Sequence, residues 1–140
     1  MTPREIIGEL VVGDAVTGPV LRLEEPLSLW GGFDTATGEV VAPRHPQRGC
    51  SLTGKVVLMR AGCGSSSSSS VLLESVLQGT APAALVLEVC DPILAIGAAA
   101  AAELYGKSPT VARVPRIPGL SDGTPALVRG PAPNECLDHS

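Results

Sequence analysis

Three runs of apolar residues stand out in the second half of the chain, and each has the length of a buried strand. They cover positions 55–60, 83–89 and 110–114. Glycine, proline and short polar segments separate these runs from the rest of the chain, as is typical of strand ends. The pattern therefore predicts three strands.

The two segments between these runs have the spacing of helices. The first presents apolar residues along one helix face, at positions 72, 73, 76 and 77. Gly79 follows as the residue that ends this helix. The second helix starts at Asp91, a good N-cap, with Pro92 at the first helical position, and it runs to Tyr105. The order over about 55–114 is thus β-α-β-α-β, with right-handed crossovers onto a parallel sheet.

The N-terminal segment, up to about residue 50, is organised differently, because its apolar pieces are only a few residues long and are broken by glycine and proline. The segment from Asp34 to Gly38 has turn chemistry. We expect a small, turn-rich β structure here, forming a second β layer. One more strand is predicted over 126–129. We expect a single α/β domain over 1–130, followed by a flexible tail over 131–140.

The composition is that of a globular protein. The chain has 140 residues and a mass of 14.2 kDa, enough for one domain, and 44% of its residues are apolar. The formal charge of −4 disfavours a nucleic-acid partner. No apolar run reaches the roughly 18 residues that span a membrane, and the first residues lack the pattern of a signal peptide. We therefore expect a cytoplasmic protein without membrane contact.

The four cysteines lie at positions 50, 63, 90 and 136, and they do not have the spacing of a metal site. No two of them form a Cys-x-x-Cys pair, and neither His45 nor His139 neighbours such a pair. We expect free thiols in a reducing compartment, and no metal or cofactor bound by this chain alone.

The segment from Gly62 to Ser70 is the most informative part of the sequence. Six serines in a row are most often a flexible linker. Here, however, the segment joins a predicted strand directly to a predicted helix, so there is no separate domain to tether. The alternative is a loop that opens a helix, where unpaired N–H groups and the helix dipole bind an anion or stabilise an alkoxide.

The loop does not match the common catalytic patterns. No Gly-Lys-Ser/Thr follows it, as in a phosphate-binding loop, and it has no Gly-x-Ser-x-Gly elbow. A serine triad would need His45 or His139, one before a proline and the other at the penultimate position. A catalytic serine in this loop would therefore need a partner chain.

The order of several short motifs resembles a known family. Gly62-Cys63-Gly64-Ser65-Ser66 is similar to the Gly-x-Gly-Ser-Ser loop in the swivelling domain of aconitase and isopropylmalate isomerase. More of the chain resembles the swivel domain, or small subunit, of aconitase X. The further motifs are Pro26-Leu27-Ser28-Leu29-Trp30-Gly31-Gly32-Phe33-Asp34, His45-Pro46, Gly54-Lys55-Val56, Gly79-Thr80-Ala81-Pro82-Ala83-Ala84 and Glu103-Leu104-Tyr105-Gly106-Lys107.

This resemblance implies a swivelling β/β/α domain and a hydro-lyase (dehydratase) activity. A large subunit would carry the iron–sulfur cluster, and this small subunit would supply Ser65 as the base that accepts the substrate proton. Gly62, Gly64 and Ser66 would shape the loop around it. The substrate would be a small carboxylate or phosphorylated hydroxy acid. We favour cis-3-hydroxy-L-proline, with phosphomevalonate as the alternative.

Two positions depart from the family pattern. Ser67 stands where related loops carry an arginine that grips a substrate carboxylate, and Cys63 stands where aconitase X small subunits usually have arginine. We keep both as candidate substrate contacts. A non-catalytic anion-binding or regulatory module remains an alternative of another class. An apolar face around Trp30 and Phe33 is the expected contact with the large subunit.

Overall fold

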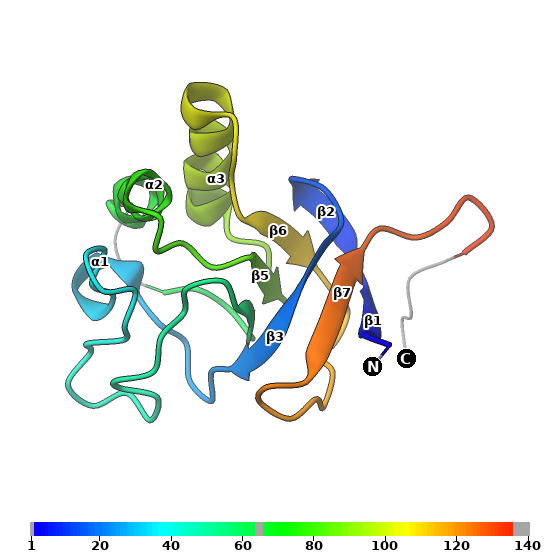
Figure 1. The fold of residues 1–140 in the computed structure, drawn as a ribbon, viewed down its shortest axis with the longest axis horizontal. Coiled ribbons are helices and arrows are strands. Elements are labelled where there is room, and N and C mark those ends of the chain that lie inside the picture. The colour runs from blue at the N-terminus through cyan, green and yellow to red at the C-terminus, as the bar shows by residue number, and fades with distance from the viewer. Residues whose placement is uncertain (1, 64–65, 136–140) are drawn as a thin grey trace.

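The strands predicted from the apolar runs form the centre of one mixed sheet. In the computed structural model, which describes residues 2–63 and 66–135, seven strands lie in the order β1-β7-β3-β4-β5-β6-β2 (Figure 1). Their bounds are β1 Arg4–Ile7, β2 Glu9–Val12, β3 Val16–Arg22, β4 Val56–Met59, β5 Ala84–Leu87, β6 Thr110–Arg113 and β7 Pro125–Arg129. Strands β3 to β6 are parallel neighbours, while β2 and β7 pair antiparallel with β6 and β3. The predicted parallel unit is confirmed.

Two helices cover one face of this sheet (Figure 1). Helix α2 spans Ser68–Gln78 and connects β4 to β5, and helix α3 spans Pro92–Tyr105 and connects β5 to β6. Both predicted ends are confirmed: Gly79 is left-handed, with φ +78°, and the Asp91 side chain accepts from the N–H groups of Ile93 and Leu94. A short turn, α1 (Leu29–Gly32), lies before the long loop that leads to β4.

The buried face of α2 differs from the predicted one. Its buried residues are Ser68, Leu72, Ser75 and Val76. Leu77 was expected on this face, but its side chain is 56% exposed. The reason is that α3 packs along the side of α2 that begins at Ser68 and Ser69. This rotates the buried stripe toward the serines.

The sheet buries apolar side chains on both faces. Every residue of β4 and β5 is buried, because α2 and α3 cover one face and the curl of the sheet encloses the other. On the enclosed face, Ile6 of β1 and Val128 of β7 pack with Val56 and Val86. The N-terminal strands therefore extend the same sheet, which bends into a half-barrel.

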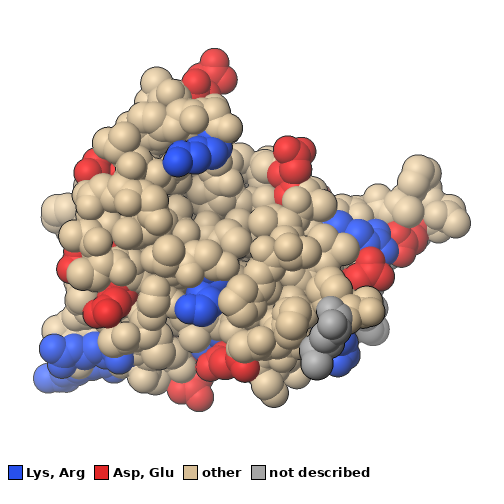
Figure 2. All heavy atoms as spheres, viewed as in Figure 1, with Lys and Arg blue, Asp and Glu red and all other residues tan. Residues whose placement is uncertain are grey.

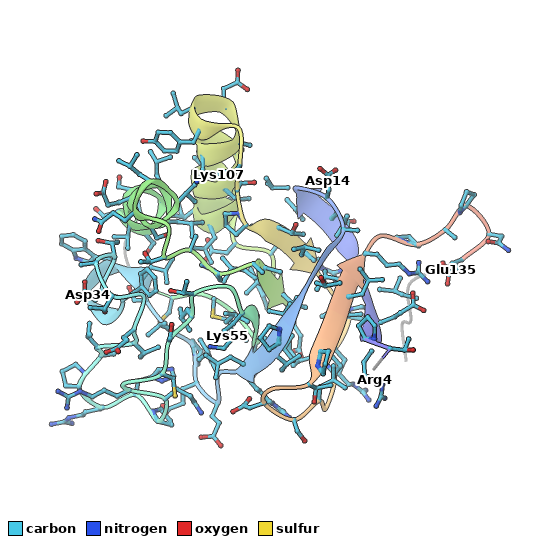
Figure 3. The ribbon with its side chains drawn as sticks, in the orientation of Figure 1. Arg4, Asp14, Asp34, Lys55, Lys107 and Glu135 are labelled. Carbon is cyan, nitrogen blue, oxygen red and sulfur yellow. The ribbon has the colours of Figure 1, made fainter. Side chains whose placement is uncertain are left out.

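The long loop between β3 and β4 is braced by its own turns. The side chain of Asp34 (Figure 3) accepts from the N–H of Ala36 at 2.8 Å, and its backbone carbonyl accepts from the N–H of Gly38 at 2.7 Å. Gly38 has a φ of +79°. The predicted turn is confirmed. His45 accepts from the N–H of Gln47 through Nδ1, so its Nε2 carries the proton and donates to the Glu25 carbonyl at 3.0 Å.

An ion-pair cluster holds the segment that follows β7. Arg129 contacts Glu5 of β1 at 2.5 Å and Glu135 at 2.8 Å. Glu135 also accepts from the N–H of Ala132 at 2.7 Å. The arginine, together with this N–H, holds the pKa of Glu135 at about 2. Residues 136–140, the rest of the segment expected to be a tail, lie outside the described residues.

Candidate active site

The serine-rich segment lies where two helices begin at one edge of the sheet. Strands β4 and β5 are parallel neighbours, so the helices that follow them start at the same edge. Helix α2 starts at Ser68 and helix α3 at Pro92. The carboxyl edge of a parallel sheet is the usual ligand-binding edge of such folds, and helix N-termini there add the positive ends of the helix dipoles.

Glycines allow close contact between the elements at this edge. Gly62 forms a parallel bridge with Leu27, and a Cβ built on it would overlap the carboxylate of Asp91. Gly97 of α3 lies against Ser69, where a Cβ would stand 2.8 Å from the Ser69 carbonyl oxygen. Larger side chains at these two positions would push the helix N-termini away from the loop.

A small cavity of about 120 Å³ lies between the two helix starts. Its apolar walls come from Leu27, Leu29, Ile93 and Leu94, and its polar groups from Gly62, Cys63, Ser68 and Asp91. The Ser68 hydroxyl is buried and has no hydrogen-bond partner among residues 2–63 and 66–135. A polar group of this kind usually has a water or ligand as its partner in the working protein.

The structure brings most of the described candidate residues to this place. Gly62 and Cys63 line the cavity, and the Cys63 thiol is free and exposed. Ser66 and Ser67 form the turn that opens α2: the Ser66 carbonyl accepts from the Ser69 hydroxyl at 3.1 Å, and the Ser67 carbonyl accepts from the N–H of Ser70 at 3.1 Å. The serine run is thus the entry to a helix, and the linker interpretation is wrong. Gly64 and Ser65 lie outside the described residues.

Two polar cavity residues, Ser68 and Asp91, were not singled out as site residues from the sequence. Ser68 looks identical to its neighbours in the serine run, and only the packing of α3 against α2 shows that it is the buried one. Asp91 was predicted only as an N-cap. Its Oδ1 has that role, but its Oδ2 lies over Gly62.

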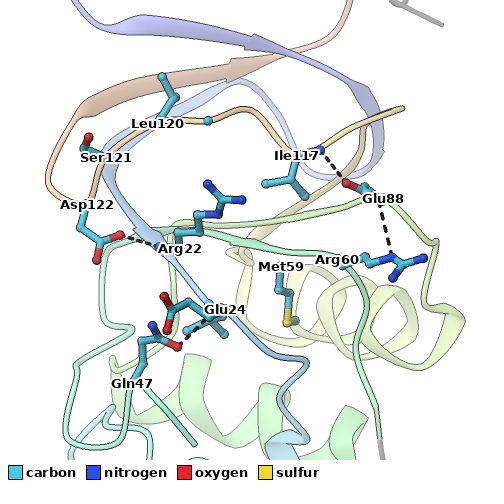
Figure 4. A pocket seen from close by; sticks show the side chains of 12 residues that line it. Arg22, Glu24, Gln47, Met59, Arg60, Glu88, Ile117, Leu120, Ser121 and Asp122 are labelled. Atoms are coloured by element: carbon cyan, nitrogen blue, oxygen red, sulfur yellow. Dashed lines mark hydrogen bonds and ion pairs between the residues drawn. The ribbon is translucent and has the colours of Figure 1, made fainter. Parts of the chain in front are cut away.

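A second cavity, of about 740 Å³, lies at the same edge of the sheet, at the carboxyl ends of β3, β4 and β5 (Figure 4). Its charged lining residues are Arg22, Glu24, Arg60, Glu88 and Asp122. Here Oε1 of Glu88 lies 3.8 Å from Nε of Arg60, and Oε2 of Glu88 accepts a hydrogen bond from the N–H of Ile117. Because acids outnumber arginines, this cavity is poorly suited to a phosphate.

The charges and possible metal ligands of the described residues are dispersed. No group of three or more His, Cys, Asp or Glu side chains among residues 2–63 and 66–135 could hold a metal ion, so these residues do not fit an iron–sulfur cluster. On the face shown in Figure 2, acidic and basic side chains are scattered. None of the described helices is long and apolar enough to cross a bilayer.

The expected apolar face is divided between surface and core. Trp30 is 59% exposed, next to the cavity residue Leu29, whereas Phe33 is buried in the core between sheet and helices. The prediction that Phe33 lies on a surface that contacts the large subunit is therefore wrong. Ile96 and Leu104 of α3 are exposed as well. These three side chains, with Leu77 and Val89, are among the large apolar groups that the described residues expose.

Comparison with known proteins places this fold and loop in one family. A sequence profile of the aconitase X swivel domain matches residues 5–132. Cis-3-hydroxy-L-proline dehydratase of Pseudomonas aeruginosa is 42% identical over 107 residues, which are 76% of this chain and 18% of that protein. The phosphomevalonate dehydratase small subunit of Methanothermobacter thermautotrophicus is 46% identical over 81 residues, which are 58% of this chain and 62% of that subunit.

A solved structure agrees with the sequence comparison. The crystal structure of Thermococcus kodakaraensis aconitase X (holo-form) superimposes with a TM-score of 0.75 at 27% identity, covering 85% of this chain and 86% of that chain. In the two sequence relatives named above, the matched part is 18% and 62% of the protein, so this chain spans less than two thirds of the length of either one. Since the profile covers nearly all of its length, the chain belongs to the aconitase X swivel domain family.

Proposed function

We propose that this chain is the small subunit of an aconitase X-type dehydratase, and that Ser65 removes the proton in the elimination of water. In such a reaction a C–H bond and a C–O bond break and a C=C bond forms. The proton goes to the serine oxygen, and the hydroxyl leaves with the help of the partner subunit. This chain would contribute the base and the wall of the site that surrounds it.

One observation supports this role most directly: the turn at Ser66 and Ser67, which follows Ser65 in the sequence, opens α2 beside the start of α3. Serine is a weak base at its ordinary pKa and needs its oxyanion stabilised. The first-turn N–H groups of Ser69 and Ser70 bond to the carbonyls of Ser66 and Ser67, and those of Ile93 and Leu94 bond to Asp91, so the two helices act on a nearby negative charge mainly through the positive ends of their dipoles. In the sequence, Ser65 directly precedes the turn that opens α2.

The neighbouring residues have supporting roles in this proposal. Gly62 lets the loop pass the Asp91 carboxylate, and Gly64 together with Ser66 shapes the turn around Ser65. Ser67, in place of the arginine of related loops, leaves carboxylate binding to hydroxyl and N–H donors. Cys63 lines the cavity as a small wall residue.

We favour cis-3-hydroxy-L-proline as the substrate, with phosphomevalonate as the alternative. Relatives of both kinds are similarly close to this chain, at 42% identity over 107 residues and 46% over 81 residues, so the preference rests on the cavity. No Lys, Arg or His is present among the described residues that line the cavity beside the serine loop, so they offer no partner for a phosphate. A small zwitterion is a better match to such a lining.

The partner in this proposal is a large aconitase X subunit that carries the iron–sulfur centre. The bacterial relative is several times longer than this chain, so most of that enzyme has no counterpart here. Trp30, Ile96 and Leu104 give this chain exposed apolar groups for such a contact.

The proposal is tested by co-expressing this chain with an aconitase X large subunit from the same source. The purified complex is assayed for dehydration of cis-3-hydroxy-L-proline and, separately, of phosphomevalonate. We expect one heteromeric species that dehydrates the hydroxyproline, while either subunit alone is inactive. A stable complex that dehydrates neither compound would contradict the proposal and favour an anion-binding or regulatory module.

A further inference from the structure

The buried hydroxyl of Ser68 is the strongest unexplained feature of the molecule. Ser68 is 4% exposed, and its Oγ lacks a hydrogen-bond partner in the part of the chain that the structure describes. Ser75, the other buried serine of α2, donates to the Leu72 carbonyl at 2.6 Å. A buried serine in a helix can therefore be satisfied here by a backbone carbonyl, but none of the described residues does this for Ser68. Ser68 is one of the residues that line the cavity between α2 and α3, and its buried hydroxyl is a donor for which the described residues provide no acceptor.

The second polar group of the cavity is an acceptor. Asp91 uses Oδ1 to cap α3, at 3.0 Å from the N–H of Ile93 and 3.4 Å from that of Leu94. No hydrogen bond or ion pair to its Oδ2 is found among the described residues, and this oxygen lies over Gly62 at the cavity wall. The cavity thus carries an unused donor and an unused anionic acceptor.

We propose that this cavity is the subsite for the amino-acid end of the substrate. Ser68 Oγ donates to an oxygen of the substrate carboxylate, and Asp91 Oδ2 accepts a hydrogen bond from the ammonium group. An α-amino acid carries these two groups on one carbon, so both fit within a short span. The inference rests on the proposed function, and it selects a zwitterionic substrate over a phosphorylated one.

Charge and size both favour this ligand. Asp91 is the charged group among the described lining residues, so its carboxylate would repel a compound that carries only negative groups. The N-termini of α2 and α3 offset part of this charge and favour the carboxylate on the Ser68 side. About four water molecules in liquid water occupy the same volume as this cavity of about 120 Å³. A space of this size suits the polar end of a small amino acid.

The binding test uses two ligands that differ in one group. L-Proline has a carboxylate and a ring ammonium, and tetrahydrofuran-2-carboxylate has the same ring with an oxygen in place of the ammonium. Each is titrated into the full 140-residue chain and followed by amide chemical shifts at Gly62, Ser68 and Leu94. We expect L-proline to bind at least about tenfold more tightly, the ratio for one charge-assisted hydrogen bond. Equal binding of both, or binding of neither, would overturn the proposal.

Three variants separate binding from folding. Asp91→Asn keeps a good N-cap but removes the charge. Ser68→Ala removes a hydroxyl that has no partner, so its melting temperature should not fall below that of the unaltered chain. Ser75→Ala is the matched control, because it alters a buried serine of the same helix that does not line the cavity.

In the reconstituted complex, Asp91→Asn and Ser68→Ala should each raise KM for cis-3-hydroxy-L-proline by about tenfold or more. Ser75→Ala should leave KM unchanged. If the complex dehydrates hydroxyproline and both cavity variants keep a normal KM, the subsite is wrong while the dehydratase function stands. If the complex prefers phosphomevalonate, the zwitterion assignment is wrong although the enzyme class is right. If it dehydrates neither, the proposed function fails, and the titration alone decides whether the subsite exists.

Discussion

Gly97 provides a test of how closely α3 holds the start of α2. It lies in the middle of α3 and is buried, with its Cα facing the backbone of Ser69. In the substitution Gly97→Ala the new methyl group would lie 2.8 Å from the Ser69 carbonyl oxygen and 3.0 Å from its Cα. These are backbone atoms, so no side-chain rotation can relieve the contact.

The two contributions to stability have opposite signs. A glycine-to-alanine change inside a helix ordinarily stabilises it by about 1 kcal/mol. Overpacking a tight contact costs about 1–3 kcal/mol, and the helices must separate by roughly half an ångström to restore a normal distance. The gain expected from helix propensity should therefore be cancelled or reversed, giving a net loss of up to about 2 kcal/mol.

The assay combines thermal unfolding with turnover of the reconstituted complex. We expect the melting temperature to be unchanged or lower, and kcat to fall by about tenfold, because the displaced turn carries the serine loop. Ala99→Gly, on the exposed side of the same helix, is the control. It should lower stability by about 1 kcal/mol without changing kcat. A Gly97→Ala variant that is more stable by about 1 kcal/mol and fully active would refute this account of the helix contact.

Two further predictions concern the C-terminal ion pairs and the metal content. Because Arg129 lowers the pKa of Glu135 from 4.5 to about 2, this pair stabilises the fold above pH 4.5 and is lost as the pH falls toward 2. An NMR titration of the Glu135 side chain measures this, and a midpoint near 4.5 would contradict it. The purified chain alone should bind no iron, since its described cysteines are not grouped with other ligands. Stoichiometric iron and sulfide in the isolated chain would show that the cluster belongs to this subunit.

The central part of the fold could be predicted because its signals are local. The apolar runs of β4, β5 and β6 are continuous, and the helix ends at Asp91 and Gly79 have caps that depend only on neighbouring residues. The places of β1 and β2 could not be predicted in this way. Each has four residues, and each pairs with a strand more than 90 residues away, which no local pattern encodes.

The candidate site shows the same division. The position of the serine loop between a strand and a helix follows from local sequence, and so does the capping role of Asp91. The burial of Ser68, the exposure of Leu77 and the burial of Phe33 all depend on how α3 and the long loop pack. Six identical serines give no means of choosing the buried one before the helices are placed.

The central claim is that Ser65 is the base, and turnover of the Ser65→Ala complex tests it most directly. Loss of a positioned base typically costs about 10²–10⁴-fold in rate, so we predict a fall in kcat of at least about 100-fold, with the complex still assembled. Ser70→Ala, at an exposed position inside α2, is the matched control and should keep nearly normal turnover. A Ser65→Ala complex that dehydrates its substrate at close to the normal rate would contradict the serine-base mechanism.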